Sequence, residues 1–209
     1  MKCQVLIVED QAMPRQLFEI FVDSSEKFNR VGSITNADLA LPFCKSTKVD
    51  LILMDVCTAL NASGLDAAES IKKQLPDIRI IIVTSMPEFS WISRARSIGV
   101  DSFWYKDADR QAILSIMERT MAGESVYPDE TPDVAIGLSS SHEFTDRELD
   151  VLKKLTTGAS NAEIGDQLCI STSTVKRHVE NMLIKTGFRT RTELVSEAVR
   201  LGIALPYQN

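Results

Sequence analysis

Four short apolar runs in the first half of the chain are each followed by a polar residue that phosphoryl transfer could use. The pairs of run and polar residue are 5–8 with Glu9 and Asp10, 51–54 with Asp55, 80–83 with Thr84, and 103–105 with Lys106. A carboxylate attacks phosphorus only when nearby positive charge offsets its own. Carboxylates can hold a divalent cation, and a lysine or a hydroxyl can bind phosphoryl oxygens. We therefore predict that Asp55 is a nucleophile that forms an aspartyl phosphate.

The order of these runs predicts the sheet that brings the polar residues together. Short runs rich in β-branched and aromatic residues are typical of buried parallel strands. Helical spacing fills the segments between them, and a weaker strand lies near 31–34. The predicted helices are 14–23, 36–46, 63–74, 88–98 and 108–121. Five strand–helix units predict a doubly wound parallel sheet, and in the order 2-1-3-4-5 its first and third strands present Asp10 and Asp55 at the ligand-binding crevice.

The alternation of predicted strands and helices ends after Gly123. The stretch 123–143 is rich in Pro, Gly and Ser and is predicted to be a flexible linker between domains 1–122 and 144–209. Four helices are then expected, at 146–157, 161–168, 172–186 and 191–202. Capping boxes are predicted at Thr145, Ser160 and Thr190, and left-handed residues at Gly158 and Gly187.

Composition limits the class of protein. The chain has 209 residues, of which 44% are apolar, and no apolar run approaches the roughly 20 residues of a membrane span. Residues 1–143 carry 14 basic and 21 acidic residues, whereas 144–209 carry 9 and 8. The four cysteines lack metal-ligand spacing, and the N-terminus does not resemble a signal peptide. We expect a cytoplasmic protein with reduced thiols and two domains that have different partners.

The first 122 residues resemble the flavodoxin-like receiver domain of bacterial response regulators. The resemblance rests on the acidic pair, Asp55, Thr84 and Lys106 at successive strand ends. It implies phosphorylation at Asp55 and a divalent cation, such as Mg²⁺, held by Glu9, Asp10, Asp55 and the backbone carbonyl of Cys57. Thr84, Lys106 and the aromatic Phe103, three residues before the lysine, then form the switch. In this family such an aromatic turns inward when the threonine hydroxyl moves to the phosphate.

The loop after Asp55 departs from the receiver pattern. Receivers usually carry a proline four residues after the phosphorylated aspartate and a glycine eight after it. Here Ala59 replaces the proline and Gly64 stands one place late. A loop longer by one residue is expected to weaken metal binding or to alter the choice of kinase.

The C-terminal segment resembles a LuxR-type DNA-binding domain over 143–206. The matching motifs are 145–148, 159–164, 170–178 and 185–187. A short helix, a turn at 169–172 and an amphipathic helix form a helix-turn-helix, whose second helix would enter the major groove. The resemblance assigns DNA contacts to Thr174, Lys176, Arg177, His178, Glu180, Asn181 and Lys185. It assigns subunit pairing to the last helix, through Leu194, Val195, Ala198 and Val199.

Together these features predict a response regulator of the NarL/FixJ type. A sensor histidine kinase would phosphorylate Asp55, and a homodimer would grip two DNA half-sites. Turnover would be limited to this phosphoryl group, so the chain is not expected to be an enzyme. One alternative is a degenerate receiver with phosphorylation-independent DNA binding. A second alternative is a phosphohydrolase with Asp55 as nucleophile. It is disfavoured because many such enzymes have an acid–base aspartate two residues after the nucleophile, where this chain has Cys57. A third is a module whose terminal helices bind protein.

Overall fold

The computed structural model describes residues 2–106 and 110–206, which form two compact units. The first unit comprises residues 1–85 and 90–129. The second comprises residues 86–89 and 130–209.

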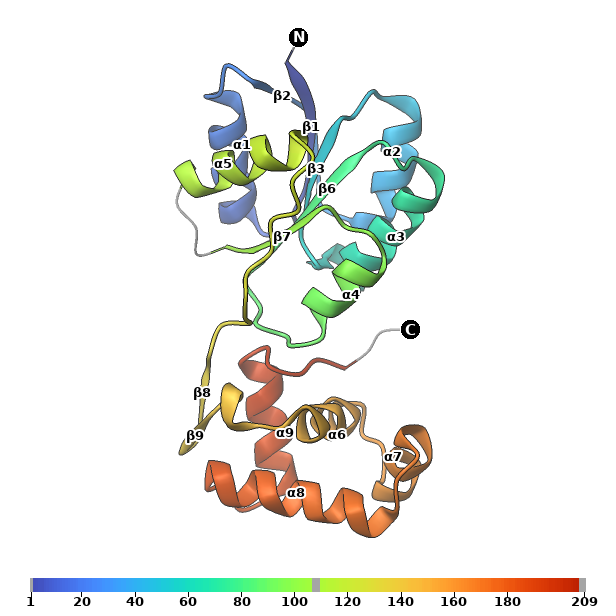
Figure 1. Cartoon of the computed structure of the whole chain (residues 1–209), viewed down its shortest axis with the longest axis vertical. Coiled ribbons are helices and arrows are strands. Elements are labelled where there is room, and N and C mark those ends of the chain that lie inside the picture. Colours follow the sequence, from blue (N-terminus) through green and yellow to red (C-terminus); the bar gives the residue numbers. More distant parts are fainter. Residues whose placement is uncertain (1, 107–109, 207–209) are drawn as a thin grey trace. The chain divides into compact units, whose positions relative to one another are not determined.

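A five-stranded parallel sheet forms the middle layer of the first unit (Figure 1). Its strands are β1 (Cys3–Val8), β2 (Phe28–Ile34), β3 (Leu51–Met54), β6 (Arg79–Thr84) and β7 (Ser102–Tyr105). Their order, β2-β1-β3-β6-β7, confirms the predicted doubly wound topology. The apolar runs are completely buried in β3 and almost so in β6, as expected for strands that helices cover on both faces.

Five helices flank this sheet. They are α1 (Ala12–Asp23), α2 (Ala40–Ser46), α3 (Gly64–Gln74), α4 (Trp91–Ser97) and α5 (Arg110–Met121). Figure 1 shows α1 and α5 on one face and α2, α3 and α4 on the other. The first two residues of the predicted helix 108–121 lie outside the described residues, and α4 begins at Trp91 rather than at residue 88. None of the described helices combines the length and the apolar character that crossing a membrane requires.

The longer loop after Asp55 folds into a small hairpin that the sequence did not predict. It consists of β4 (Cys57–Thr58), the 3-10 turn η2 (Ala59–Asn61) and β5 (Ala62–Ser63). Leu60 and Asn61 have φ of 60° and 62°, and this left-handed turn takes up the extra length. The Ala59 N–H donates to the Thr35 carbonyl over 3.0 Å, so the hairpin is fastened to the loop after β2.

The hairpin also explains the late glycine. A Cβ atom at Gly64 would lie 1.9 Å from the backbone oxygen of Asp55, which no side chain tolerates. The Gly64 N–H donates to the Val56 carbonyl over 2.8 Å. Gly64 therefore packs closely against the backbone of Asp55, although it stands one place later than in the receiver pattern.

Four helices form most of the second unit. They are α6 (Asp146–Thr156), α7 (Asn161–Leu168), α8 (Thr172–Thr186) and α9 (Arg191–Arg200). All three predicted capping boxes are present, at Thr145, Ser160 and Thr190. Gly158 and Gly187 have the predicted left-handed backbone, with φ of 82° and 75°. Cys169 ends α7 with φ of 53°, a conformation that non-glycine residues adopt reluctantly and that the sequence did not signal.

The predicted linker is more ordered than its composition indicated. Strands β8 (Ala135–Ile136) and β9 (Ser139–Ser140) pair, and the turn η3 (Ser141–Glu143) follows. Ile136 is completely buried in the core of the second unit, and the Leu138 N–H donates to the Thr186 carbonyl over 2.9 Å. Residues 130–143 therefore fold with the helices, because the buried Ile136 and a hydrogen bond to the end of α8 hold this segment in place.

Candidate functional site

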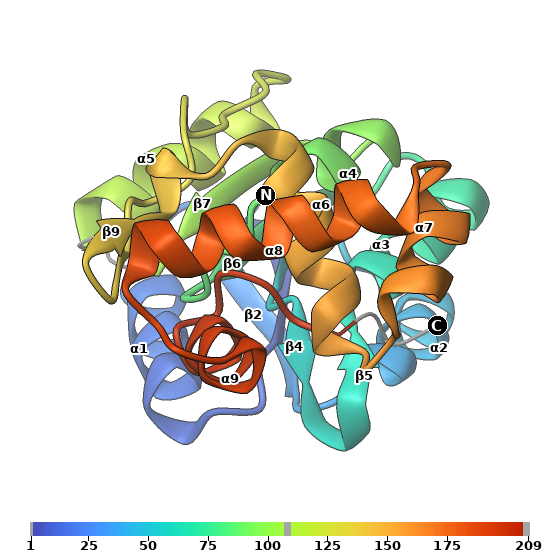
Figure 2. The same cartoon turned by 90° about the horizontal axis from the view of Figure 1, so that it is seen from below.

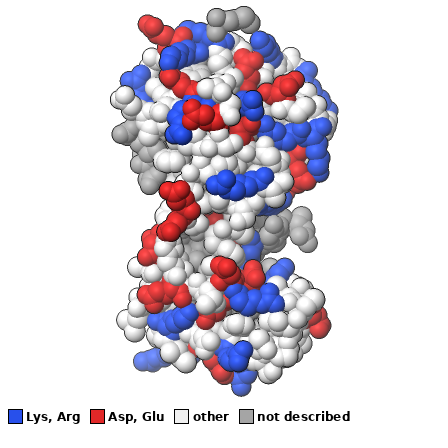
Figure 3. Space-filling view, in the orientation of Figure 1, with Lys and Arg blue, Asp and Glu red and all other residues white. Residues whose placement is uncertain are grey.

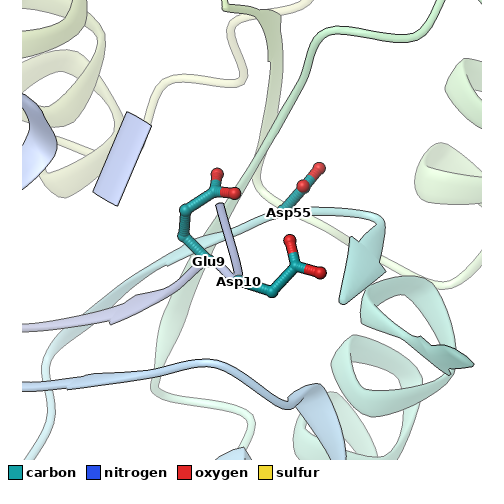
Figure 4. A group of neighbouring side chains, drawn as sticks. All are labelled: Glu9, Asp10 and Asp55. Carbon is teal, nitrogen blue, oxygen red and sulfur yellow. The ribbon is translucent and has the colours of Figure 1, made fainter. Parts of the chain in front are cut away.

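Three carboxylates meet at the carboxyl edge of the sheet, as Figure 4 shows. Glu9 and Asp10 follow β1, and Asp55 follows its neighbour β3. One ligand oxygen from each lies within 4.8 Å of the other two. Glu9 and Asp55 are 1% and 5% exposed, so water screens little of their charge. Such a cluster of hard oxygen ligands can hold a divalent cation.

Lys106 joins two of these carboxylates. Its Nζ lies 2.5 Å from Glu9 Oε2 and 2.8 Å from Asp55 Oδ2. The backbone N–H of Lys106 donates to the backbone carbonyl of Thr84 over 2.9 Å, which holds the residue after β7 against the end of β6. The second oxygen of Asp55, Oδ1, accepts the Val56 N–H over 2.7 Å. Both oxygens of the predicted nucleophile are thus held in place.

Burial and charge shift the pKa values in this pocket. Burial raises the pKa of Glu9, and repulsion from Asp55 raises it further. Burial also raises the pKa of Asp55, although the Lys106 ammonium offsets part of this. Burial acts to lower the pKa of Lys106, but Asp55 and Glu9 outweigh it and the pKa is raised, so the ammonium stays charged.

These shifts have a consequence for stability. A carboxyl whose pKa is raised on folding binds its proton more tightly in the folded chain than in the unfolded one. The free energy of unfolding therefore falls as the pH rises from the unfolded pKa to the folded pKa. A bound cation would favour the ionised carboxylates and so reduce this loss.

The remaining predicted pocket residues occupy different environments. Thr84, 1% exposed, ends β6 beside the strands that carry Asp55 and Lys106. Phe103 is completely buried, edge-on to Tyr105 with ring centroids 5.5 Å apart and stacked on Tyr127 at 6.3 Å. Phe103 thus already lies inside the core in this structure. Cys57 is exposed at the start of β4, two residues after Asp55.

Arg15 is a pocket residue that the sequence pattern did not predict. Its Nη1 donates to the backbone carbonyls of both Glu9 and Asp10, each over 3.0 Å. The available signal was an arginine in the first turns of the helix that follows the acidic pair. This signal is weak, because an arginine at such a place usually faces solvent.

In the second unit, α8 (Figure 2) carries most of the residues predicted to bind DNA. Lys176 and Glu180 are 71% and 57% exposed at the side chain, and their charged atoms lie 3.7 Å apart. Arg177 and Asn181 are exposed as well, whereas Thr174 and His178 are only partly so. The opposite stripe, made of Val175, Val179 and Met182, is buried in the core. Amphipathic packing therefore leaves the polar stripe of α8 facing solvent.

Charges on the second unit are mixed rather than uniformly basic. Figure 3 shows acidic and basic side chains side by side on the face in view. This agrees with the near balance of 9 basic and 8 acidic residues over 144–209. A local stripe, rather than the charge of the whole unit, would have to attract DNA.

Lys185 differs from the other residues predicted to bind DNA. Its Nζ lies 2.7 Å from Glu148 Oε2 and donates to the Glu143 carbonyl over 2.7 Å. Glu148, 3% exposed, is the carboxylate of the first capping box. Burial acts to raise the pKa of Glu148, but hydrogen bonds from Lys185 and Thr145 outweigh it, and the pKa is lowered. Lys185 thus makes internal contacts that link the end of α8 to the start of α6.

Replacing Lys185 by methionine should lower the free energy of unfolding by about 1–2 kcal/mol, a value reduced from that of a fully buried pair because the lysine is partly exposed. The loss should disappear as the pH falls through the folded pKa of Glu148, because protonation removes the same ion pair. Urea denaturation of the full chain, followed by circular dichroism at several pH values, measures both effects. Lys176→Met, which removes an exposed ion pair on the same helix, should change stability by less than about 0.5 kcal/mol. Unchanged stability with weakened DNA binding would instead support the DNA contact that the resemblance implies.

The predicted dimerisation residues divide into two pairs. Leu194 and Ala198 are completely buried in the unit's own core, so they cannot reach a partner without opening it. Val195 and Val199 are partly exposed on α9. Of the four predicted residues, Val195 and Val199 are the ones that could reach a second subunit with the core intact, because helical spacing puts them beside the core stripe rather than in it.

Comparisons with known families match both units. The family model described as "Response regulator receiver domain" matches residues 5–118. The model described as "Bacterial regulatory proteins, luxR family" matches residues 142–198.

Two relatives match along almost the whole chain. The response regulator protein VraR of Staphylococcus epidermidis is 32% identical over 203 residues, covering 93% of this chain and 95% of the relative. VraR of Staphylococcus aureus strain Mu3 gives the same identity and coverage.

Solved structures match at the level of the fold. RcsB of Salmonella enterica serovar Typhimurium, bound to a promoter in the presence of the phosphomimetic BeF3−, is 15% identical with a TM-score of 0.65, covering 95% of this chain and all of the other. The response regulator ChrA of a heme-sensing two-component system is 20% identical with a TM-score of 0.53, covering 95% and 97% of the two chains.

Proposed function

Because this chain belongs to the response regulators that join a receiver domain to a luxR-type domain, we infer that it is a transcription regulator whose binding to DNA is switched by phosphorylation of Asp55. One observation carries this inference. Asp55 lies beside two further carboxylates and a buried lysine at the carboxyl edge of the sheet. A sensor histidine kinase is the expected phosphoryl donor, because receivers accept the group that such kinases carry.

The chemistry of the pocket fits a divalent cation such as Mg²⁺. Glu9, Asp10 and Asp55 would hold it, and the resemblance adds the backbone carbonyl of Cys57. Asp10 Oδ1 is buried and has no hydrogen-bond donor among the described residues, as an oxygen reserved for a metal would. When bound, the cation neutralises charge between Asp55 and the incoming phosphoryl group.

The chain's own residues supply the rest of the reaction. A carboxylate oxygen of Asp55 forms a bond to phosphorus while the bond from phosphorus to the donor's nitrogen breaks, and the donor leaves with that electron pair. Lys106, already 2.8 Å from Asp55 Oδ2, is placed to pair with a phosphoryl oxygen. Thr84, at the adjacent strand end, would donate its hydroxyl to another. Both contacts to the phosphoryl oxygens would exist only in the phosphorylated form, which is the difference between states that a switch requires.

The DNA-binding part of the proposal depends on α8. Its exposed polar stripe carries Lys176 and Arg177 near the N-terminal half of the helix, which approaches base edges in helix-turn-helix proteins. The partly exposed Val195 and Val199 on α9 would contact a second subunit. Binding to DNA also implies a cytoplasmic location, with which the lack of a disulfide at the four described cysteines agrees.

The direct test measures whether phosphorylation changes DNA affinity. The full chain is treated with acetyl phosphate and Mg²⁺, and binding to DNA fragments selected from a random pool is measured by fluorescence anisotropy. We expect affinity to rise about tenfold or more, which corresponds to about 1.4 kcal/mol of coupling. Asp55→Asn, treated in the same way, should show no rise. Equal affinity of fully phosphorylated and untreated chains would favour the alternative, a regulator that binds DNA independently of phosphorylation.

A further inference from the structure

We propose that Arg15 is a positioning residue of the phosphorylation site, which fixes the turn that presents Glu9 and Asp10 to the cation. This proposal rests on the function inferred above, since it concerns how the same pocket is built. Arg15 lies on α1 and does not belong to the carboxylate cluster itself.

The turn between β1 and α1 has few other restraints. The last sheet bond of this strand is the one from the Glu9 N–H to the Ile34 carbonyl, at 2.9 Å. The N-cap residue of α1 is Gln11, and its side chain makes no capping hydrogen bond to the first turn of the helix. The Gln11 N–H instead donates to Glu9 Oε1 over 3.0 Å, which ties up one oxygen of a predicted ligand.

Arg15 restrains this turn through hydrogen bonds to its backbone carbonyls. Its Nη1 carries two protons and donates to the carbonyls of Glu9 and Asp10, each over 3.0 Å. These are the backbone groups of the two residues whose side chains must converge on one ion. Loss of both bonds loosens the turn at Asp10, whereas Glu9 is still held by Ile34, Gln11 and Lys106, and a cation then has to order Asp10 when it binds. The cost therefore falls on binding of the cation rather than on the chemical step.

The test measures Mg²⁺ binding directly, by isothermal titration calorimetry of the full chain with MgCl2. We expect Arg15→Met to weaken Mg²⁺ binding about tenfold. The variant loses two hydrogen bonds from a charged guanidinium, and water can partly replace this donor at the Glu9 and Asp10 carbonyls. The rate of phosphorylation by acetyl phosphate at saturating Mg²⁺ should stay within about twofold of wild type. Arg30→Met is the matched control, since it removes an arginine ion pair with Asp23 elsewhere in the first unit and should leave Mg²⁺ affinity unchanged.

The outcomes separate this proposal from the proposed function. Wild type that binds no Mg²⁺ overturns the metal-dependent function itself. Wild type that binds Mg²⁺ while Arg15→Met binds it equally well overturns only the role of Arg15. A variant whose rate at saturating Mg²⁺ falls together with its unfolding midpoint shows a merely structural role, which also overturns the proposal. If Arg15→Met does not fold, Arg15→Lys carries the same test, with about threefold weaker binding expected from a donor that lacks the planar fork.

Discussion

Replacing Asp55 by asparagine should abolish phosphorylation of the chain by acetyl phosphate and Mg²⁺, with a rate at least about a hundredfold below that of wild type. An amide oxygen is a poor nucleophile at neutral pH, and the other two carboxylates of the cluster are expected to bind the cation. The Asp55 oxygen that Lys106 contacts at 2.8 Å is held within hydrogen-bond reach of the ammonium that would pair with the phosphoryl group. Incorporation of phosphate, measured by intact-protein mass spectrometry, checks the result.

The control for this experiment is Asp77→Asn. Asp77 is an exposed carboxylate in the turn before β6, and its loss should leave the rate unchanged. Circular dichroism should give the same spectrum for both variants, since asparagine has nearly the shape of aspartate. Full labelling of Asp55→Asn would refute the assignment of the nucleophile.

The second large effect is expected at the exposed stripe of α8. Replacing both Lys176 and Arg177 by alanine should weaken DNA binding by about a hundredfold at low salt, because an arginine contact to a base is worth about 1–3 kcal/mol and a phosphate contact adds to it. The slope of the logarithm of affinity against the logarithm of salt concentration should fall by about 0.9 for each DNA phosphate that the variant no longer neutralises. Fluorescence anisotropy over a range of salt concentrations measures both quantities.

Arg200→Ala serves as the control on another helix. Arg200 is 65% exposed at the side chain and paired with Glu197, so it carries the same charge outside the stripe. Its loss should leave the affinity within about twofold. If the double variant kept both the affinity and the salt slope of wild type, α8 would not be the recognition helix.

Local features were predictable from the sequence because they depend on neighbours along the chain. The capping boxes at Thr145, Ser160 and Thr190 each need only a hydroxyl and a glutamate three residues apart. The convergence of Asp10 and Asp55 needs more, namely the strand order of a parallel sheet. The alternation of strands and helices predicts such a sheet, and in the observed order, β2-β1-β3-β6-β7, the two strands that precede these aspartates are neighbours.

Contacts between distant residues were not predictable in this way. Lys185 fits a basic position of a recognition helix, yet its ammonium contacts Glu148, 37 residues earlier. Leu194 and Val195 are adjacent apolar residues, and only the packing of α9 makes the first completely buried and the second partly exposed. A helical repeat gives the direction of each side chain but not what lies in that direction.

The sequence by itself determined the two domains, the parallel sheet and the polar residues at four of its strand ends, because residue type and spacing along the chain specify strands, helices and caps. Tertiary structure alone decided how the pocket is held. It turned the longer loop after Asp55 into a hairpin that brings Gly64 against the backbone of Asp55, and it placed Arg15 on the carbonyls of the acidic pair. The physical reason is that a hydrogen bond or a close backbone approach depends on three-dimensional position, which spacing along the chain does not specify.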